Sequence, residues 1–267
     1  MFDTRKTSGL GIVSCASCHP DTRMDRLAWD IGDPAGKLVT LTNSAPGGQV
    51  LTYHPMKGPM VTQTLQDIIT PPTKPQQLMH WRGDRLNIED FNQTFTNLLA
   101  NDVALTADEM TELKVLLSSI FTPPNVHRTF SNTFPALVPL PGHYGIPNGS
   151  TPTLLPPGNP QARLSIFSSF VCTTCHDSYS GRSATVSGNV VDVRRGHPQG
   201  FFLTPQLRNL TDKTGMDGSS TNGRAGFGFM HDGRVDTLSR FLNDGFAVVP
   251  ASFVSNQRIA DMVAFLL

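Results

Sequence analysis

The sequence lacks a run of apolar residues that approaches the roughly 20 needed to cross a membrane, and its first residues lack the apolar segment of a signal peptide. It also lacks an excess of either charge, because 21 lysines and arginines balance 21 aspartates and glutamates. Nucleic-acid binding normally needs a basic patch or stripe. We therefore expect no membrane span and no nucleic-acid partner.

Charged residues are scarce at 16%, whereas glycine and proline are frequent, with 23 and 21 copies. The 38% of hydrophobic residues suffices for a core, but so many turn-forming residues predict short elements and much irregular backbone. The last residues, "DMVAFLL", lie inside a predicted helix. We therefore expect the chain to be a mature fragment, or one region of a longer protein.

Cysteine is also scarce, and all four copies fall in two short motifs. "SCASCHP" contains Cys15, Cys18 and His19, and "VCTTCHD" repeats the order with Cys172, Cys175 and His176. A disulfide scaffold would normally distribute its cysteines along the chain. The remaining readings are a zinc site, a redox dithiol and covalent attachment of haem.

Haem attachment explains the spacing best. In c-type haem the two thiols form thioethers with the porphyrin, and the histidine that follows directly binds the iron. Zinc needs four ligands, of which each motif offers three, and a thioredoxin-like dithiol needs a βαβ context that the sequence does not show. We therefore predict two covalently attached haem c groups, with His19 and His176 as the proximal iron ligands.

An internal repeat follows each motif. Residues 54–68, "HPMKGPMVTQTLQDI", are similar to 197–210, "HPQGFFLTPQLRNL", and residues 79–91, "MHWRGDRLNIEDF", align without gaps to 229–241, "FMHDGRVDTLSRF". Each half then ends in a predicted amphipathic helix. The first has Thr106 as its N-cap, with a capping box to Glu109, and the second has Ser255 as its N-cap. Their apolar stripes are Met110, Leu113, Leu117 and Ile120 in the first, and Ile259, Met262, Val263 and Leu266 in the second.

The repeat predicts a mainly α protein with little strand. We expect a first cytochrome c-like haem domain at 1–121, a connector at 122–160 and a second such domain at 161–267. The connector is rich in Pro, Gly, Asn and Ser and has no periodicity, which is typical of a segment draped over the surface. Its aromatic residues Phe130, Phe134 and Tyr144 are unusual in a linker and leave packing open.

These motifs together resemble the bacterial di-haem cytochrome c peroxidase and MauG superfamily. "TPQLRNL" and "FMHDGRVDTL" resemble signatures of that family's second domain, and "MHWRGDRL" resembles its tryptophan-containing stretch more loosely. The resemblance implies that Trp81 relays charge between the haems, the alternative being an ordinary core aromatic. It also implies that His54 is the sixth ligand of the first iron, with Met56 and Met60 as alternatives.

The chain departs from the family at the second iron. The family often places a methionine after the "HDGR" helix, but "FLNDGFAVVP" at 241–250 has no Met, His or Tyr. His197 stands where His54 stands in the repeat, so we predict it as the sixth ligand of the second iron. Met216 and His231 are rivals.

Further residues have ordinary alternatives. Glu109 superficially resembles the family's catalytic glutamate, but its capping box explains it. The family resemblance implies that Asp67 helps to bind Ca²⁺. Arg82, Arg208 and Arg234 are candidates to pair with haem propionates, or are ordinary surface arginines. The remaining histidines, His80, His127 and His143, are expected to be exposed or hydrogen-bonded.

Two functions remain open. One is electron transfer between the two haems and redox partner proteins. The other is an enzyme, a peroxidase that reduces hydrogen peroxide at the first haem with electrons that arrive through the second. Because haem c is attached outside the bacterial inner membrane, we expect a periplasmic or extracellular protein. A haem module appended to a larger protein or assembly is compatible with either function.

Overall fold

The computed structural model describes most residues of the chain. For some of these, within helices and strands, it describes the backbone and not the side chain. The described residues are 1–32, 37, 39–42, 50–53, 58–69, 78–81, 85–146, 151–162, 167, 172–176, 190–192, 201–208, 210–214, 228–245 and 255–267. They fall into two compact units. The first unit comprises Met1–Thr122 and Thr185–Pro205, and the second comprises Pro123–Ala184 and Gln206–Leu267.

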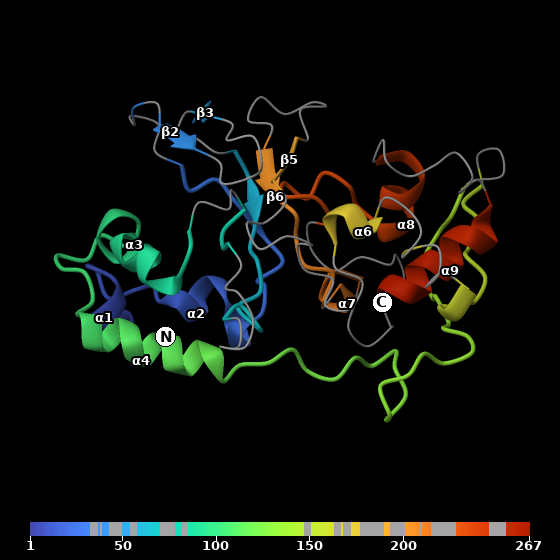
Figure 1. Cartoon of the computed structure of the whole chain (residues 1–267), viewed down its shortest axis with the longest axis horizontal. Coiled ribbons are helices and arrows are strands. Elements are labelled where there is room, and N and C mark those ends of the chain that lie inside the picture. The colour runs from blue at the N-terminus through green and yellow to red at the C-terminus, as the bar shows by residue number, and fades with distance from the viewer. Residues whose placement is uncertain are drawn as a thin grey trace. The chain divides into compact units, whose positions relative to one another are not determined.

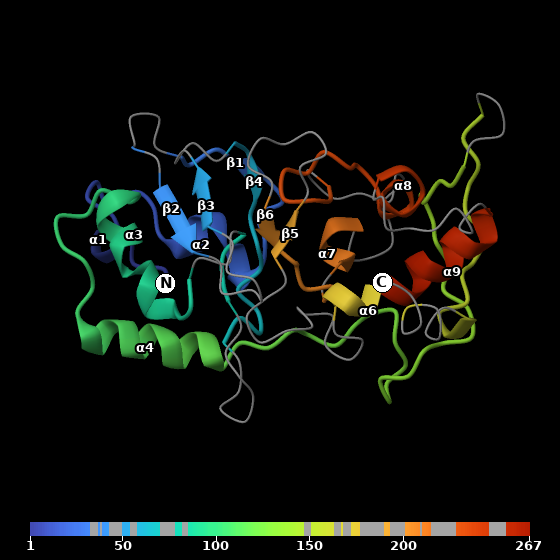
Figure 2. The same cartoon turned by 45° about the horizontal axis from the view of Figure 1, so that its top comes forward.

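The first unit combines short helices with three antiparallel two-stranded ladders (Figure 1). Its helical elements are α1 (Thr4–Thr7), α2 (Cys15–Cys18), η1 (Pro20–Thr22), η2 (Ile88–Phe91), α3 (Asn92–Asn97) and α4 (Ala107–Ser118). The ladders pair β1 (Ala28–Trp29) with β4 (Met60–Val61), β2 (Val39–Thr42) with β3 (Val50–Tyr53), and β5 (Val190–Asp192) with β6 (Phe201–Leu203). Figures 1 and 2 both place the β5–β6 hairpin beside β4.

Helix α4 closes the first unit as its capping residues predict. The Thr106 side chain accepts a hydrogen bond from the Glu109 N–H, and the Glu109 carboxylate accepts one from the Thr106 N–H at 2.8 Å. The predicted apolar stripe of α4 faces the core, with Met110 and Leu117 buried. The Glu109 carboxylate also pairs with Lys6, and this bond is the main reason that the pKa of Glu109 lies below its usual value. The capping box and this ion pair give the Glu109 carboxylate a structural role at the start of α4.

The second unit contains α6 (Cys172–Cys175), α7 (Thr211–Thr214), α8 (Leu238–Arg240), the π-helical turn η3 (Phe241–Gly245) and α9 (Asn256–Leu266). Ser255 caps α9 as predicted, because its side chain accepts a hydrogen bond from the Arg258 N–H. The helix is buried beyond the predicted stripe, since every residue from Ile259 to Phe265 is buried. An amphipathic helix would leave one side to water, so a further segment must cover α9.

The segment expected to form the connector covers it. Val138, Leu140 and Leu155 belong to the same core cluster as α9, and the N–H of Asn159 donates to the buried carboxylate of Asp261 at 2.9 Å. At the start of α9, the Asn256 side chain accepts from the Ile146 N–H at 2.7 Å. The segment after residue 122 is therefore part of the second core, held by individual side-chain bonds that produce no hydrophobic period.

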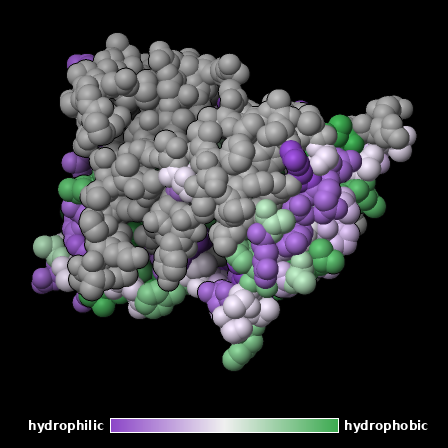
Figure 3. Space-filling view, turned by 45° about the vertical axis from the view of Figure 1, so that its right-hand side comes forward, coloured by the Kyte–Doolittle hydropathy of each residue, from purple (hydrophilic) through white to green (hydrophobic). Residues whose placement is uncertain are grey.

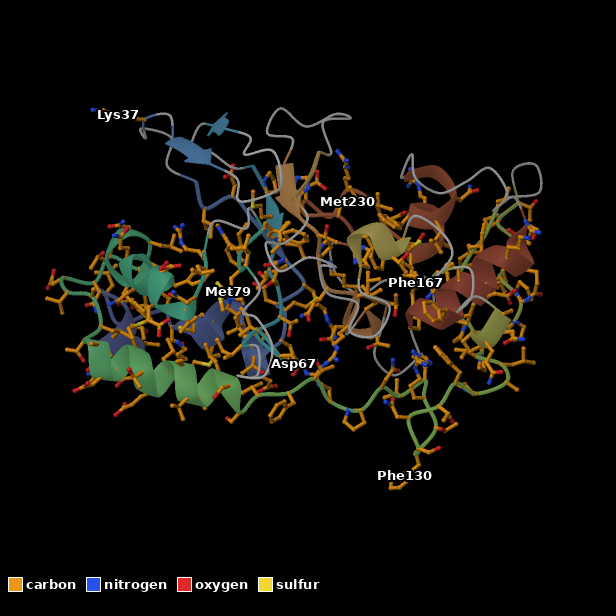
Figure 4. The ribbon with its side chains drawn as sticks, viewed as in Figure 1. Lys37, Asp67, Met79, Phe130, Phe167 and Met230 are labelled. Carbon is orange, nitrogen blue, oxygen red and sulfur yellow. The ribbon has the colours of Figure 1, made fainter. Side chains whose placement is uncertain are left out.

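The aromatic residues of this segment differ in their environments. Phe134 stacks on Phe265 with ring centroids 5.4 Å apart, and Phe265 also contacts Phe167 at 5.1 Å. Phe130 instead points away from the protein at the tip of a tight loop (Figure 4). Among the residues coloured in Figure 3, hydrophilic and hydrophobic side chains are interspersed over the visible face.

The internal repeat is visible in the backbone. The N–H of Met79 donates to Arg85 at 2.8 Å, and at the aligned positions the N–H of Phe229 donates to Val235 at 2.7 Å. The residues that follow, His80 and Met230 (Figure 4 labels Met230), have left-handed φ values of 70° and 69°. Each copy then starts a helix after Asn87 or Thr237, which are also aligned.

The ladders repeat as well. β1 follows the first cysteine motif and pairs with β4, which directly precedes residues 62–68. β5 follows the second motif and pairs with β6, which directly precedes residues 204–210. The second hairpin nevertheless belongs to the first compact unit, so the repeat boundaries and the compact units do not coincide.

Candidate haem-attachment sites

The first cysteine motif forms a single helical turn, α2. The N–H of His19 donates to the carbonyl of Cys15 at 2.9 Å, which closes the turn, and Ser14 N–H donates to Ser17 Oγ at 3.0 Å just before it. Residues three apart on a helix share a face, so Cys15 and Cys18 present their thiols on one side. Both thiols are free, as a haem-attachment site requires before thioethers form.

The second motif has the same backbone. The N–H of His176 donates to the carbonyl of Cys172 at 2.7 Å and closes the helical turn α6. The Cys172 side chain packs against the core cluster that contains α9. Two segments more than 150 residues apart therefore adopt one local conformation.

The imidazole of His19 is suited to bind iron. Its Nδ1 is buried without a hydrogen-bond partner. Burial lowers the pKa of His19, while the backbone of Gln63 and the carboxylate of Asp25 oppose this. The lowered pKa favours the neutral ring, which is the form that coordinates a metal.

The thiols of the first motif are partly desolvated. Burial raises the pKa of Cys15. Burial also raises the pKa of Cys18, and the nearby carboxylate of Asp25 raises it further. Both shifts favour the neutral thiol form of these cysteines.

A site built from protein ligands alone is not seen in the described part of the chain. Within it, no group of three or more His, Cys, Asp or Glu side chains is arranged to hold a metal ion. A haem iron needs only one or two axial ligands from the protein. The free thiols and the neutral imidazole of the first motif fit covalent haem.

Trp81 is buried between two strands of the first unit, with 6% of its surface exposed. Its indole N–H donates to the carbonyl of Val61 in β4 at 2.7 Å. Its own carbonyl accepts the N–H of Leu203 in β6, also at 2.7 Å. Trp81 is thus bonded to β4, which follows the first cysteine motif in the sequence, and to β6, which follows the second.

Most candidate sixth ligands, His54, Met56, His197 and Met216, lie outside the described residues. Met60 is buried in β4. His231 is 2% exposed, and its Nε2 lies 3.8 Å from Oδ2 of Asp232. In the repeat His231 aligns with Trp81, so a buried imidazole in the second unit stands where the first has a buried indole.

Candidate charged residues are placed as follows. Arg82 lies outside the described residues, Arg208 is half-buried, and exposed Arg234 has its Nε 4.0 Å from Asp232. Asp67, labelled in Figure 4, accepts the N–H of Thr122 at 3.0 Å. The Asp67 carboxylate therefore holds the chain where it leaves α4, and its role in binding Ca²⁺ stays a prediction.

The histidines without a motif differ from one another. His80 is half-buried and makes an edge contact with Phe91 at 6.1 Å, and burial lowers the pKa of His127. His143 is buried, with Nδ1 3.1 Å from the carbonyl of Pro141 and Nε2 without a partner. Its burial has no sequence signal, because it depends on the packing of the segment 123–160.

Sequence reasoning missed two charged residues, one in each unit. Lys213 in α7 lies with its Nζ 5.7 Å above the ring of Phe229, and burial lowers its pKa to about 8. The charge of Asp25 raises the pKa of Cys18 and opposes the lowering of the pKa of His19 by burial. A single lysine or aspartate carries no sequence pattern that would single it out.

Comparison with known proteins gives a similarity of fold. No family model matches the chain, and no curated protein matches it. Among solved structures, the chain is similar to a chain of Kuenenia stuttgartiensis hydrazine synthase, determined under 20 bar of xenon. The match has a TM-score of 0.56 at 15% identity and covers 97% of this chain and 82% of that one. The chain is therefore a distant structural relative of that chain.

Proposed function

We propose that the chain is a di-haem c-type cytochrome of the peroxidase-like superfamily, which carries electrons between its two covalent haems and redox partner proteins. The observation that carries the proposal is the repeated motif geometry. In each motif the histidine N–H closes one helical turn onto the carbonyl of the first cysteine, and in the first motif both thiols are free. Haem would supply a one-electron couple at each site.

The residues of the first motif would hold the group in defined ways. Cys15 and Cys18 would form the thioethers, and His19 would coordinate the iron as a neutral imidazole. The same roles fall to Cys172, Cys175 and His176 in the second motif. Attachment of haem c takes place outside the bacterial inner membrane, so the proposal includes a periplasmic or extracellular location. The described part of the chain has no helix that is both long and apolar enough to cross a membrane.

A peroxidase is the second candidate. Reduction of hydrogen peroxide at the first haem would need electrons from the second, and the bonds of Trp81 to β4 and β6 favour such a path. The two candidates differ in whether the first iron opens to an external ligand.

Visible spectra of the purified protein test both candidates. We expect the oxidised and reduced spectra to show two low-spin c-type haems, because each iron would be closed by two protein ligands. The variant His54→Gly is expected to convert the first haem to a high-spin form that binds cyanide. His127→Gly serves as a control and should leave both haems low-spin. An unchanged spectrum in His54→Gly would contradict the ligand assignment, and rapid peroxide turnover by the unmodified protein would favour the enzyme.

Trp81 can be tested separately. Trp81→Phe keeps an aromatic ring but removes the N–H bonded to Val61, so we expect a loss of about 1 kcal/mol in stability and slower transfer between the haems. Trp81→Leu, which also removes the ring, should slow transfer further. Flash-induced electron transfer between the haems measures this order. Equal rates in all three proteins would exclude a relay through Trp81.

A further inference from the structure

Two neighbouring loops of the first unit expose large aliphatic side chains. The four residues are Leu10, Ile12, Leu98 and Val103, and between 46% and 80% of each is exposed. Leu10 and Ile12 lie on the loop that follows α1, whereas Leu98 and Val103 lie on the loop that joins α3 to α4. We call these four residues the aliphatic patch.

Hydrogen bonds hold the two loops together. The N–H of Gly9 donates to the carbonyl of Leu99 at 3.0 Å, and the side-chain amide of Asn101 donates to the carbonyl of Lys6 at 2.8 Å. The loops are also in close contact, because a Cβ atom at Gly9 would clash with the carbonyl of Ala100. The exposed aliphatic side chains therefore come from adjacent backbone segments and form one surface.

Both loops are fixed on the first unit. The Ser8 hydroxyl accepts the N–H groups of Ile12 and Val13, each at 3.2 Å, and the Ser8 carbonyl accepts the N–H of Gly11 at 3.0 Å. On the second loop, Leu99 packs against the core cluster that contains α4. A partner that covers the aliphatic patch would therefore order little additional backbone, which lowers the entropic cost of association.

A charge of each sign accompanies the aliphatic patch. Arg5 is exposed, and its stem lies beside the first loop, because a Cβ atom at Gly11 would be 3.5 Å from Cγ of Arg5. Asp102 is exposed on the second loop, directly before Val103. Among the described residues, neither charged side chain forms an ion pair. A surface with a base on one loop and an acid on the other is complementary to itself.

The aliphatic patch is large enough to form the apolar part of an interface. Its four side chains expose roughly 450 Å², a size at which patches on monomers are often functional. A standard interface buries about 800 Å² on each partner, of which about 56–65% is apolar. The aliphatic patch therefore supplies most of the apolar area that one side of such an interface needs.

We propose that the aliphatic patch is the contact surface between two copies of this chain, related by a two-fold axis. In such an interface both copies use the same surface, so a contact from Arg5 of one copy to Asp102 of the other occurs twice. A guanidinium and a carboxylate can pair through two parallel hydrogen bonds. The interface belongs to the first unit and does not depend on haem.

Analytical ultracentrifugation of the full chain over a range of concentrations tests the proposal. We expect an equilibrium between monomer and dimer. Leu10→Asp places a charge within the apolar contact and should raise the dissociation constant at least about 100-fold. Leu137→Asp changes an exposed leucine of the second unit and should leave the dissociation constant unchanged. A monomer at every concentration, or a dimer that Leu10→Asp does not weaken, would overturn the proposal.

Charge reversal tests the two-fold arrangement. Arg5→Asp brings two acids together at each contact and Asp102→Arg brings two bases together, so each variant alone should associate at least about tenfold more weakly. An equimolar mixture of the two variants restores both ion pairs and should form dimers as readily as the unmodified chain. Neither variant carries the original pair, so an effect on its own fold cannot produce this recovery. A mixture that associates no better than the separate variants would contradict the arrangement.

Discussion

Replacement of Cys15 and Cys18 together by serine is expected to halve the haem that is covalently bound to each chain. Serine cannot form the thioethers, whereas the second motif belongs to the other compact unit and keeps its own turn, closed by His176. The pyridine haemochrome spectrum per mole of protein measures the loss, and haem staining after denaturing electrophoresis shows that the remaining haem is covalent.

The control for this experiment lies inside the motif. Ala16→Ser changes a residue between the two cysteines, leaves both thiols in place, and should retain full haem content. The reciprocal variant, with Cys172 and Cys175 replaced by serine, should also lose half. Full haem content in either double variant would contradict covalent attachment at that motif. Complete loss in both would show that the two sites cannot be loaded independently.

The substitution Gly158→Ala is expected to cost at least about 3 kcal/mol of stability. A Cβ atom at Gly158 would lie 2.1 Å from the carbonyl oxygen of Ala260 and 2.7 Å from the side chain of Ala264. Gly158 is also bridged to Val138 by two backbone hydrogen bonds. The strand-like segment would have to move away from α9, which is the centre of the second core. Chemical denaturation, followed by circular dichroism, measures the change.

Leu154→Ala is the matched control for this substitution. Leu154 lies on the same segment but is 57% exposed, so its truncation should change stability by less than about 0.5 kcal/mol. If Gly158→Ala unfolds at the same denaturant concentration as the unmodified protein, the close packing of this segment on α9 is wrong.

Local signals predicted the parts of the fold that depend on neighbouring residues. The caps Thr106 and Ser255 were identifiable because a cap bonds to an N–H within three residues. The gapless alignment of 79–91 with 229–241 was equally informative, since the same turn appears at both places. In each case the sequence pattern and the hydrogen bonds that it produces lie within a few residues of each other.

The covering of α9 could not be predicted for the opposite reason. Asn159 and Asp261 are 102 positions apart, and Ile146 and Asn256 are 110 apart. A single bond between distant residues leaves no period in the sequence. The many prolines and glycines of this segment therefore indicated a connector. The same limit applies to the candidate site. The motifs indicated where haem would attach, but the effect of Asp25 on the pKa of His19 could not be predicted, because Asp25 belongs to no motif.

The position of the β5–β6 hairpin has a consequence for synthesis of the chain. The hairpin ends at Leu203 yet completes the first compact unit, where the N–H of Leu203 bonds to Trp81. On a ribosome, where chains fold from the N-terminus onward, the segment up to Thr122 must therefore wait for some 80 further residues before its last strand arrives. The second cysteine motif, at residues 172–176, is synthesised within that interval, before the last strand of the first unit.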